Sequence, residues 1–272
     1  MRFLFWLIPA LAAVLAAQNV SYTYDAAGRL TGVTYPSGKV LTYTYDASGN
    51  VTQRSVMDPS STPAPTITAE AIVNAAGRSS GPVAPGELIV IAGGGLGPTT
   101  PARNSADRRG VLGTAAGQTS VLFDGVPAPV VYAAASEVSV VVPDSVAGKA
   151  TTHVVVWHRG KSSAAVELPV AAAAPGLFPD SVRNADGSAN GTDHPAVPGS
   201  LVSLRGTGRG KGPALWEVTV AGGKVEAEVA NRGAGVFEIR FRIPDGTPPG
   251  AAPVRVTMGG ISSQPGIQVA VK

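Results

Sequence analysis

The chain has 272 residues, of which 14% are charged, and a formal net charge of +3. It contains no cysteine, which excludes disulfide bonds, thiolate metal sites and cysteine nucleophiles. The positive excess includes Arg2 and forms no clustered basic footprint, so we expect no nucleic-acid partner. The 34 glycines and 23 prolines, with short runs of Val, Ala and Thr, predict many strands and turns and little helix.

The N-terminus predicts a secretory signal. Arg2 provides a basic start, residues 3–15 are an unbroken apolar run, and residues 16–17 are both alanine. We therefore expect a signal peptide at residues 1–17 and a secreted or cell-surface protein. An uncleaved membrane anchor is the alternative, although the run is shorter than the roughly 20 residues of a spanning helix. After cleavage of the signal we expect no membrane span.

Residues 18–52 are rich in Tyr, Thr and Val between glycine turns, which is typical of short antiparallel strands. The motifs YDAAGRL, YPSGKV and YDASGNV resemble the YD repeats of Rhs-type proteins. In that family many repeats coil into a shell around a cargo, and two repeats are too few to enclose one. We expect a short YD-repeat β-hairpin segment. Residues 53–66, rich in Pro, Ser and Thr, are predicted to be a linker.

The main body contains an internal repeat. The stretch VAPGELIVIAGGGLG at residues 83–97 returns as VPGSLVSLRGTGRG at residues 197–210, and later turn motifs align in the same order. A Pro-Gly turn, a short apolar run and a glycine cluster are typical of a sandwich strand. The repeat therefore predicts two related Ig-like β-sandwiches, at residues 67–178 and 179–272.

Period-two alternation predicts which strand residues face the core. The pattern is clearest at residues 236–243, and the alignment transfers it to the first copy. The predicted inward residues are Ile89, Ile91, Val138, Val140, Val142, Val202, Leu204, Trp216, Val218, Val220, Phe237, Ile239, Phe241 and Ile243. The predicted outward residues are Ser139, Ser203, Arg205, Glu238, Arg240 and Arg242.

Residues 73–272 resemble a family of uncharacterised C-terminal domains of secreted acidobacterial (Solibacter-type) proteins, which are similar to IPT/TIG-type Ig-like modules. The motifs are VLFDGVPAPVVYA, VVPDSVAGK, RIPDGTPPG and GGISSQPGIQVAVK. The resemblance implies an all-β fold with two tandem Ig-like (IPT/TIG-like) β-sandwiches after the YD-repeat segment, and it implies no catalytic residues. The sequence departs from the family at residues 222–235, where KVEAEVANRGAG replaces an apolar stretch.

Patterns that would indicate catalysis or cofactor binding are incomplete. Residues 77–81 match G-x-S-x-G, but no helix follows them. His153 and His158 are five apart on a predicted strand and therefore face opposite sides. The glycine-rich run at 206–211 lacks the spacing of a phosphate loop. Oxygen ligands for calcium, or Asx-Gly turns, are offered by Asn184, Asp186, Asn190 and Asp193. We predict no catalytic, cofactor-binding or metal site, and no enzyme.

Two features predict a binding surface. Trp157 aligns with an outward position, so it is either an exposed aromatic of the kind that binds glycans or is covered by a neighbouring part of the chain. Arg205, Arg209 and Lys211 either attract an anionic polymer at a sandwich end or form a solvated rim.

The function predicted from these observations is that of a non-catalytic structural or adhesion module. Its predicted partner is a polysaccharide, another cell-envelope component or another secreted protein. The alternative is a scaffold or carrier fragment of an Rhs-type toxin or of a carbohydrate-active enzyme.

Overall fold

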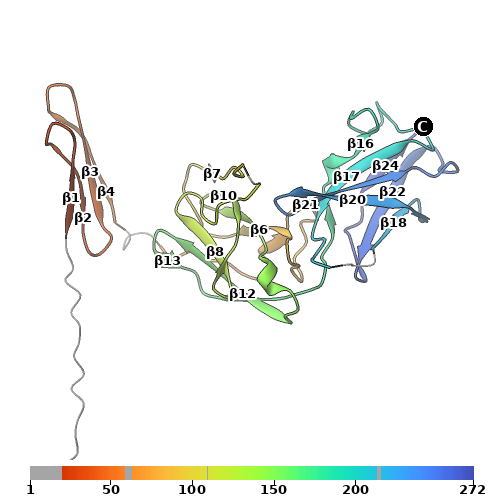
Figure 1. Cartoon of the computed structure of the whole chain (residues 1–272), viewed down its shortest axis with the longest axis horizontal. Helices are drawn as coiled ribbons and strands as arrows, with labels where there is room; N and C mark the ends of the chain where they lie inside the picture. The colour runs from red at the N-terminus through yellow and green to blue at the C-terminus, as the bar shows by residue number, and fades with distance from the viewer. Residues whose placement is uncertain (1–19, 59–62, 109, 213–215) are drawn as a thin grey trace, which may run out of the picture. The chain divides into compact units, whose positions relative to one another are not determined.

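The computed structural model describes residues 20–58, 63–108, 110–212 and 216–272 (Figure 1). The predicted signal peptide, residues 1–17, lies outside these ranges. The chain separates into two compact units, Met1–Thr62 and Pro63–Lys272. Apart from the 3-10 turns η2 (Asp144–Val146) and η3 (Pro179–Ser181), all regular elements within those ranges are strands, which confirms the all-β prediction. The same ranges contain no helix that is long and apolar enough to cross a membrane.

The first unit is a four-stranded antiparallel sheet rather than a single hairpin. Its strands follow chain order as β1 (Ser21–Tyr24), β2 (Leu30–Thr34), β3 (Val40–Tyr45) and β4 (Val51–Met57). β4 continues past Thr52 into the predicted linker, because its residues stay in register with β3 as far as Met57 opposite Val40. Hydroxyl pairs such as Thr42 and Ser55, 2.6 Å apart, support this extended pairing.

The YD motif forms the turns of this sheet. Asp25 accepts hydrogen bonds from the backbone N–H groups of Ala27 (3.0 Å) and Arg29 (2.9 Å), and Asp46 does the same in the second repeat. The glycine of each motif takes a positive φ that other residues rarely adopt, for example +79° at Gly28. Arg29 joins the two repeats, because it pairs with Asp25 and its guanidinium lies 4.7 Å from the centre of the Tyr45 ring. The YD motif therefore stabilises the turns between the strands of this sheet.

The second unit contains two sandwiches, each made of two five-stranded sheets. In the first sandwich one sheet has the order β5 (Ile72–Asn74), β6 (Leu88–Ala92), β11 (Glu137–Val141), β10 (Val130–Ala133) and β7 (Ala102–Arg103). The facing sheet has the order β13 (Lys161–Ser162), β12 (Thr151–His158), β8 (Thr119–Phe123) and β9 (Val126–Pro127), with β14 (Val166–Pro169) also paired to β12.

The second sandwich repeats this topology. One sheet has the order β15 (Gly176–Leu177), β17 (Leu201–Thr207), β21 (Val236–Arg242) and β20 (Ala227–Gly233), with β16 (Arg183–Asn184) also paired to β17. The facing sheet has the order β19 (Gly223–Val225), β18 (Trp216–Val220), β22 (Gly250–Met258) and β23 (Ile261–Ser262), with β24 (Gln268–Val271) paired to β22. The pairs β6–β11 and β17–β21 correspond, as the internal repeat predicts. β15 belongs to this sandwich although it precedes residue 179.

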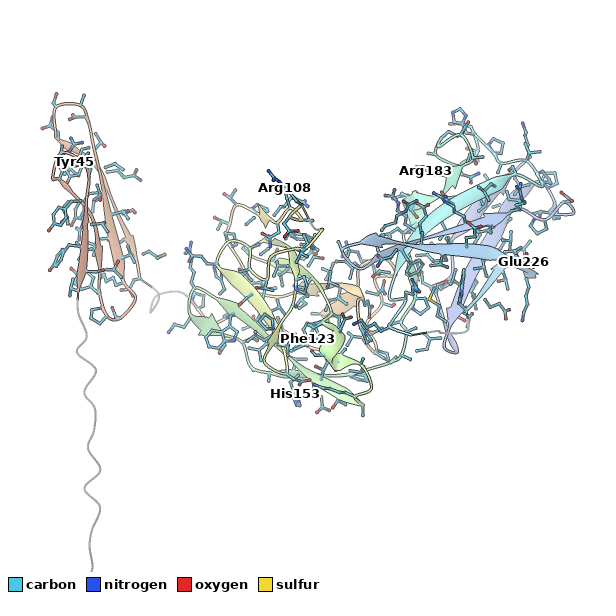
Figure 2. All side chains as sticks on the ribbon, in the orientation of Figure 1. Tyr45, Arg108, Phe123, His153, Arg183 and Glu226 are labelled. Carbon is cyan, nitrogen blue, oxygen red and sulfur yellow. The ribbon has the colours of Figure 1, made fainter. Side chains whose placement is uncertain are left out.

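The predicted inward residues form the two cores, with one exception. Ile89, Ile91 and Ile239 are fully buried, and Phe123 fills the first core (Figure 2). Trp216 is the exception, with 37% of its surface exposed. It is the first residue of β18, so it lies at the end of the inward row, where less of the sandwich covers it.

The prediction that Ser139 faces water is wrong. Ser139 is 3% exposed, and its hydroxyl donates to the carbonyl oxygen of Ile89 (3.0 Å). β11 lies between β6 and β10 in its sheet, and Ser139 is opposite Val90, which is itself buried. Period-two alternation assigns a residue to a face but does not reveal whether that face is covered.

The Asn74 side chain forms part of the junction between the sandwiches. Its Nδ2 donates to Glu87 Oε1 (2.7 Å) and to the carbonyl oxygen of Ala174 (3.0 Å), on the segment that leads into β15. Its Oδ1 accepts from the N–H groups of Ala76 (2.9 Å) and Gly77 (2.8 Å). All the hydrogen bonds available to this amide are made, so its position is fixed.

Thr207 forms the other part of the junction. Its hydroxyl accepts from the N–H of Leu88 in the first sandwich (2.6 Å) and donates to the carbonyl oxygen of Gly235 in the second (2.7 Å). A Cβ on Gly235 would lie 2.8 Å from the carbonyl oxygen of Gly86. The two sandwiches therefore meet with backbone directly against backbone.

Gly176→Ala is expected to loosen this junction. The added Cβ would overlap Asn74 Oδ1, so the amide must move and give up hydrogen bonds, at a cost of about 1–3 kcal/mol. Urea unfolding measures the loss. The control is Gly246→Ala, where a Cβ meets no atom within 4 Å. Equal stability of the two variants would contradict the role assigned to Asn74.

Glu87 is expected to make stability depend on pH. Burial raises the pKa of its carboxyl from 4.5 to about 8, against the opposing hydrogen bonds from Ala84 and Asn74. The folded protein then retains a proton that the unfolded chain releases near pH 4.5. The free energy of unfolding therefore falls as pH rises from about 4.5 to about 8, by at most ~1.4 kcal/mol per pH unit.

Urea unfolding of wild type and Glu87→Gln at several pH values between 4.5 and 8.5 tests this dependence. The neutral amide cannot ionise, so the difference in stability between the two proteins should shift in favour of the variant as pH rises. A difference that stays constant with pH would show that Glu87 does not titrate in this window.

Candidate ligand-binding cleft

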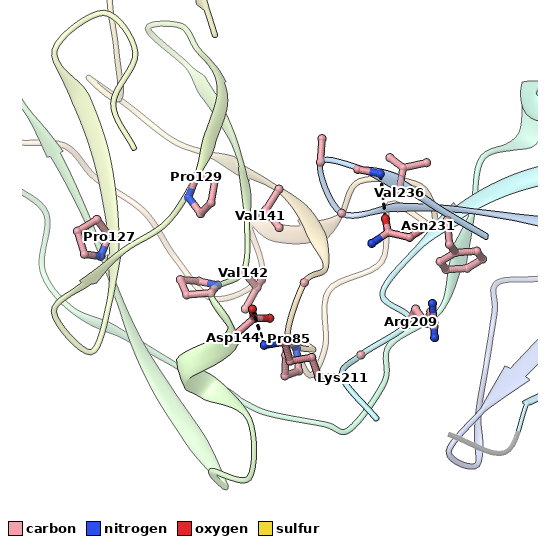
Figure 3. A pocket seen from close by; sticks show the side chains of 17 residues that line it. Pro85, Pro127, Pro129, Val141, Val142, Asp144, Arg209, Lys211, Asn231 and Val236 are labelled. Atoms are coloured by element: carbon pink, nitrogen blue, oxygen red, sulfur yellow. Dashed lines mark hydrogen bonds and ion pairs between the residues drawn. The ribbon is translucent and has the colours of Figure 1, made fainter. Parts of the chain in front are cut away.

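A cleft of about 490 Å³ lies between the two sandwiches (Figure 3). The first sandwich contributes the residues before β6, the connection between β9 and β10, and the end of β11. The second contributes the end of the glycine-rich run and the turn between β20 and β21. The residues that line the cleft include Pro85, Pro127, Pro129, Pro143, Asp144, Arg209, Lys211, Asn231, Val236 and Phe237.

Proline rings supply part of the apolar surface of the cleft. Pro85 precedes the positive-φ turn at Gly86, and Pro143 stands immediately before η2. Pro127 is the last residue of β9, and Pro129 immediately precedes β10. Rings at such positions are rigid and expose C–H groups, so the wall keeps its shape without a ligand.

Glycines explain how Arg209 reaches this cleft. Gly208 and Gly210 have φ values of +82° and +76°, and a Cβ on either would overlap a carbonyl oxygen, that of Ala174 or of Ala172. The glycine-rich run thus packs against the connection between the sandwiches and presents Arg209 between the two glycines.

The polar groups of the cleft are few, and only one charge is unpaired. Lys211 Nζ lies 2.7 Å from Asp144 Oδ2, which links the two sandwiches across the cleft (Figure 3). Asn231 Oδ1 accepts from the N–H of Gly233 (2.9 Å), so its Nδ2 remains available. Arg209 has no ion-pair or hydrogen-bond partner among the described residues. A concave apolar site with a few convergent polar groups at a domain boundary is typical of ligand binding.

The structure brings together only two of the four predicted site residues. Arg209 and Lys211 line the cleft, whereas Arg205 lines a different cavity on the outer face of β17 and β21. Trp157 is on β12 of the first sandwich, opposite Ser120 and Ser162, with 40% of its surface exposed. Among the described residues, Arg205 is therefore separated from the two residues of the cleft, Arg209 and Lys211.

The two histidines of β12 face opposite sides, as predicted. His158 is 3% exposed, its Nδ1 is 2.9 Å from Thr119 Oγ1, and burial lowers the pKa of its imidazole. His153 is exposed, and its Nδ1 lies 3.3 Å from Asp124 Oδ1. The described ranges contain no group of three or more His, Asp or Glu side chains placed to hold a metal ion.

Sequence reasoning missed Asn231, Asp144 and the prolines. Asp144 belongs to the Val-Pro-Asp motif that returns as Ile-Pro-Asp at residues 243–245, and Asn231 lies in the stretch that departs from the resembling family. Both signals were visible in the sequence. Neither indicates that the two residues line one cleft, because they belong to different sandwiches.

The fold defines the chain as a tandem Ig-like β-sandwich protein. The family model of the IPT/TIG domain matches residues 71–170, and that of the RHS Repeat matches residues 13–40 and 24–56. The chain thus carries an IPT/TIG domain after an RHS repeat. A search of curated proteins finds no relative.

Solved structures similar to this chain are distant. SGBP-B from a complex xyloglucan utilization locus in Bacteroides uniformis is 16% identical, with a TM-score of 0.26, over 75% of this chain and 49% of that one. Bacteroides ovatus SGBP-B, in complex with a mixed-linkage heptasaccharide, is 12% identical, with a TM-score of 0.35, over 92% and 57%. The I9–I11 tandem from titin is 8% identical, with a TM-score of 0.24, over 98% and 86%. The chain thus spans about half the length of the SGBP-B structures.

Lys211→Gln is expected to change the free energy of unfolding by less than about 1 kcal/mol. The side chains of the Lys211–Asp144 pair are 60% and 56% exposed, and water screens such pairs strongly. Urea unfolding of the variant, with Asp144→Asn as the matched partner change, provides the measurement. A loss above about 2 kcal/mol would mean that this pair, rather than Asn74 and Thr207, holds the sandwiches together.

Proposed function

We propose that this protein is a non-catalytic extracytoplasmic adhesion module that binds polysaccharide in the cleft between its sandwiches. The observation that carries the proposal is that the Arg209 guanidinium, unpaired among the described residues, and the Asn231 amide line one cleft together with several proline rings. Planar amide and guanidinium groups donate to sugar hydroxyls, while proline rings contact the C–H faces of a sugar. The apolar run at residues 3–15 supports secretion, with residues 1–17 as a signal peptide.

The domain organisation assigns the parts different tasks within this proposal. The two sandwiches, with β15 assigned to the second, bind the ligand between them, and the YD-repeat segment precedes them in the chain. The resemblance to secreted acidobacterial C-terminal domains supports the same location. A cell-envelope polysaccharide is the partner that this location favours.

Trp157 provides a second candidate surface for the same function. Its ring is 40% exposed on an antiparallel sheet, between the polar side chains of Ser120 and Ser162. Exposed aromatic rings with polar neighbours can stack on sugars. This surface shares no lining residue with the cleft, so separate variants distinguish the two.

Arg209→Gln is expected to weaken polysaccharide binding roughly three- to tenfold, because one ligand hydrogen bond contributes about 0.5–1.5 kcal/mol. Isothermal titration calorimetry of the full chain against soluble neutral polysaccharides and solubilised peptidoglycan provides the measurement. Arg255→Gln, which removes an exposed arginine from β22, is the matched control.

Other outcomes of this experiment identify other functions. Weakening by Trp157→Ala but not by Arg209→Gln would move the site to β12. Failure of the wild type to bind any polysaccharide in the panel would overturn the proposal, and would favour a scaffold or carrier fragment of an Rhs-type toxin or of a carbohydrate-active enzyme.

A further inference from the structure

A second cavity of about 490 Å³ lies on the outer face of the second sandwich. Its floor is the outward row of β17 and β21, where Arg205 is opposite Glu238 and Ser203 is opposite Arg240. Phe178 and Arg183, on the chain that leads from β15 to β16, form the side of the cavity. Figure 2 labels Arg183 on this face of the sandwich.

Glu238 is the centre of this face, and the prediction that it faces water is wrong. It is 6% exposed because arginines cover it. Arg232 contacts both carboxylate oxygens, with Nε 3.2 Å from Oε2, and Arg240 Nε donates to Oε1 (2.8 Å). The hydrogen bond from Arg232 is the main cause that lowers the pKa of Glu238, so the group stays ionised.

One carboxylate therefore faces three guanidinium groups. The third is Arg205, whose Nε lies 3.8 Å from Glu238 Oε2, too far for a hydrogen bond. The Arg205 side chain is 61% exposed, and its guanidinium makes no hydrogen bond to any residue that the structure describes. The N–H groups of the Arg205 guanidinium are therefore available to donate hydrogen bonds to a ligand.

The other charged groups of the cavity do not neutralise the excess of guanidinium groups around Glu238. Arg183 Nη1 donates to the carbonyl oxygens of Asp180 (3.0 Å) and Val182 (2.8 Å), and Arg183 makes no ion pair with any residue that the structure describes. Asp180 and Glu238 balance the two arginines of the lining. Arg232 and Arg240, which contact Glu238, add two positive charges, and Glu228, opposite Arg240 on β20, adds one negative charge, so one positive charge remains unbalanced.

We propose that this cavity binds a carboxylate-bearing polysaccharide, with the ligand carboxylate on Arg205 and a sugar ring against Phe178. The planar guanidinium fork matches a carboxylate with two parallel hydrogen bonds. The half-buried Phe178 ring and the Ser203 hydroxyl, which has no partner within the described ranges, complete a surface suited to a sugar. The choice of a polysaccharide rests on the proposed function, while the acidic class rests on this face alone.

The probes are polygalacturonate, which carries a carboxylate on each sugar, and its fully methyl-esterified form, which is neutral. In calorimetric titrations of the full chain, Arg205→Gln should weaken polygalacturonate binding at least about tenfold and leave binding of the ester unchanged. Arg255→Gln, which removes the same charge from the facing sheet, should leave both unchanged. The melting temperature of Arg205→Gln should match the wild type, since the guanidinium makes no hydrogen bond.

Two results would overturn the proposal for the outer cavity and leave the proposal for the cleft unaffected. The first is equal binding of polygalacturonate and its ester by the wild type. The second is Arg205-dependent binding of poly-L-glutamate that is tighter than that of polygalacturonate, which would make the partner an acidic protein. If Arg209→Gln weakens binding of the neutral ester, the proposal for the cleft is supported in either case. If Arg209→Gln has no effect on the ester while Arg205→Gln still weakens polygalacturonate binding, only the proposal for the cleft is overturned.

Discussion

The Asn74 amide is the constraint on which the arrangement of the sandwiches depends. It joins Glu87 at the start of β6 to the carbonyl oxygen of Ala174, and the absence of a side chain at Gly176 gives it the necessary room. Thr207 adds a second link at the same junction. The Thr207 link borders the cleft, because Gly235, whose carbonyl oxygen accepts from Thr207, is among the residues that line it.

The glycine clusters of the two copies serve one purpose. In the first copy, Gly93 and Gly94 pack on Thr66, with hydrogen bonds in both directions between Gly94 and Thr66. In the second copy, Gly208 packs on Ala174 in the connection between the sandwiches. Each cluster lets the segment that leads into its sandwich lie against the first long strand. Arg209 occupies the cleft as a result of this packing.

The two cavities of the second sandwich differ in the chemistry they offer. The cleft has apolar walls and one unpaired charge, whereas the outer cavity combines an aromatic ring with a surplus of guanidinium groups around Glu238. Val236, at the start of β21, is the one lining residue they share. A polymer is a ligand that could contact both, which is consistent with the class of partner proposed for each.

The sequence by itself determined the all-β fold, the order of corresponding strands in the two copies and the core-facing residues of β6, β11, β17 and β21. Those properties follow from local signals, because alternation, Pro-Gly turns and Asx-Gly turns fix how a strand begins, ends and presents its side chains. The tertiary structure alone decided which outward positions are covered. Ser139 is buried against β6, which is distant in sequence, and Glu238 is covered by arginines of β17, β20 and β21. Trp216 is exposed by its place at a strand end, and Arg205 is separated from Arg209. No local pattern encodes those outcomes, because each depends on contacts between segments that meet only when the sheets pack.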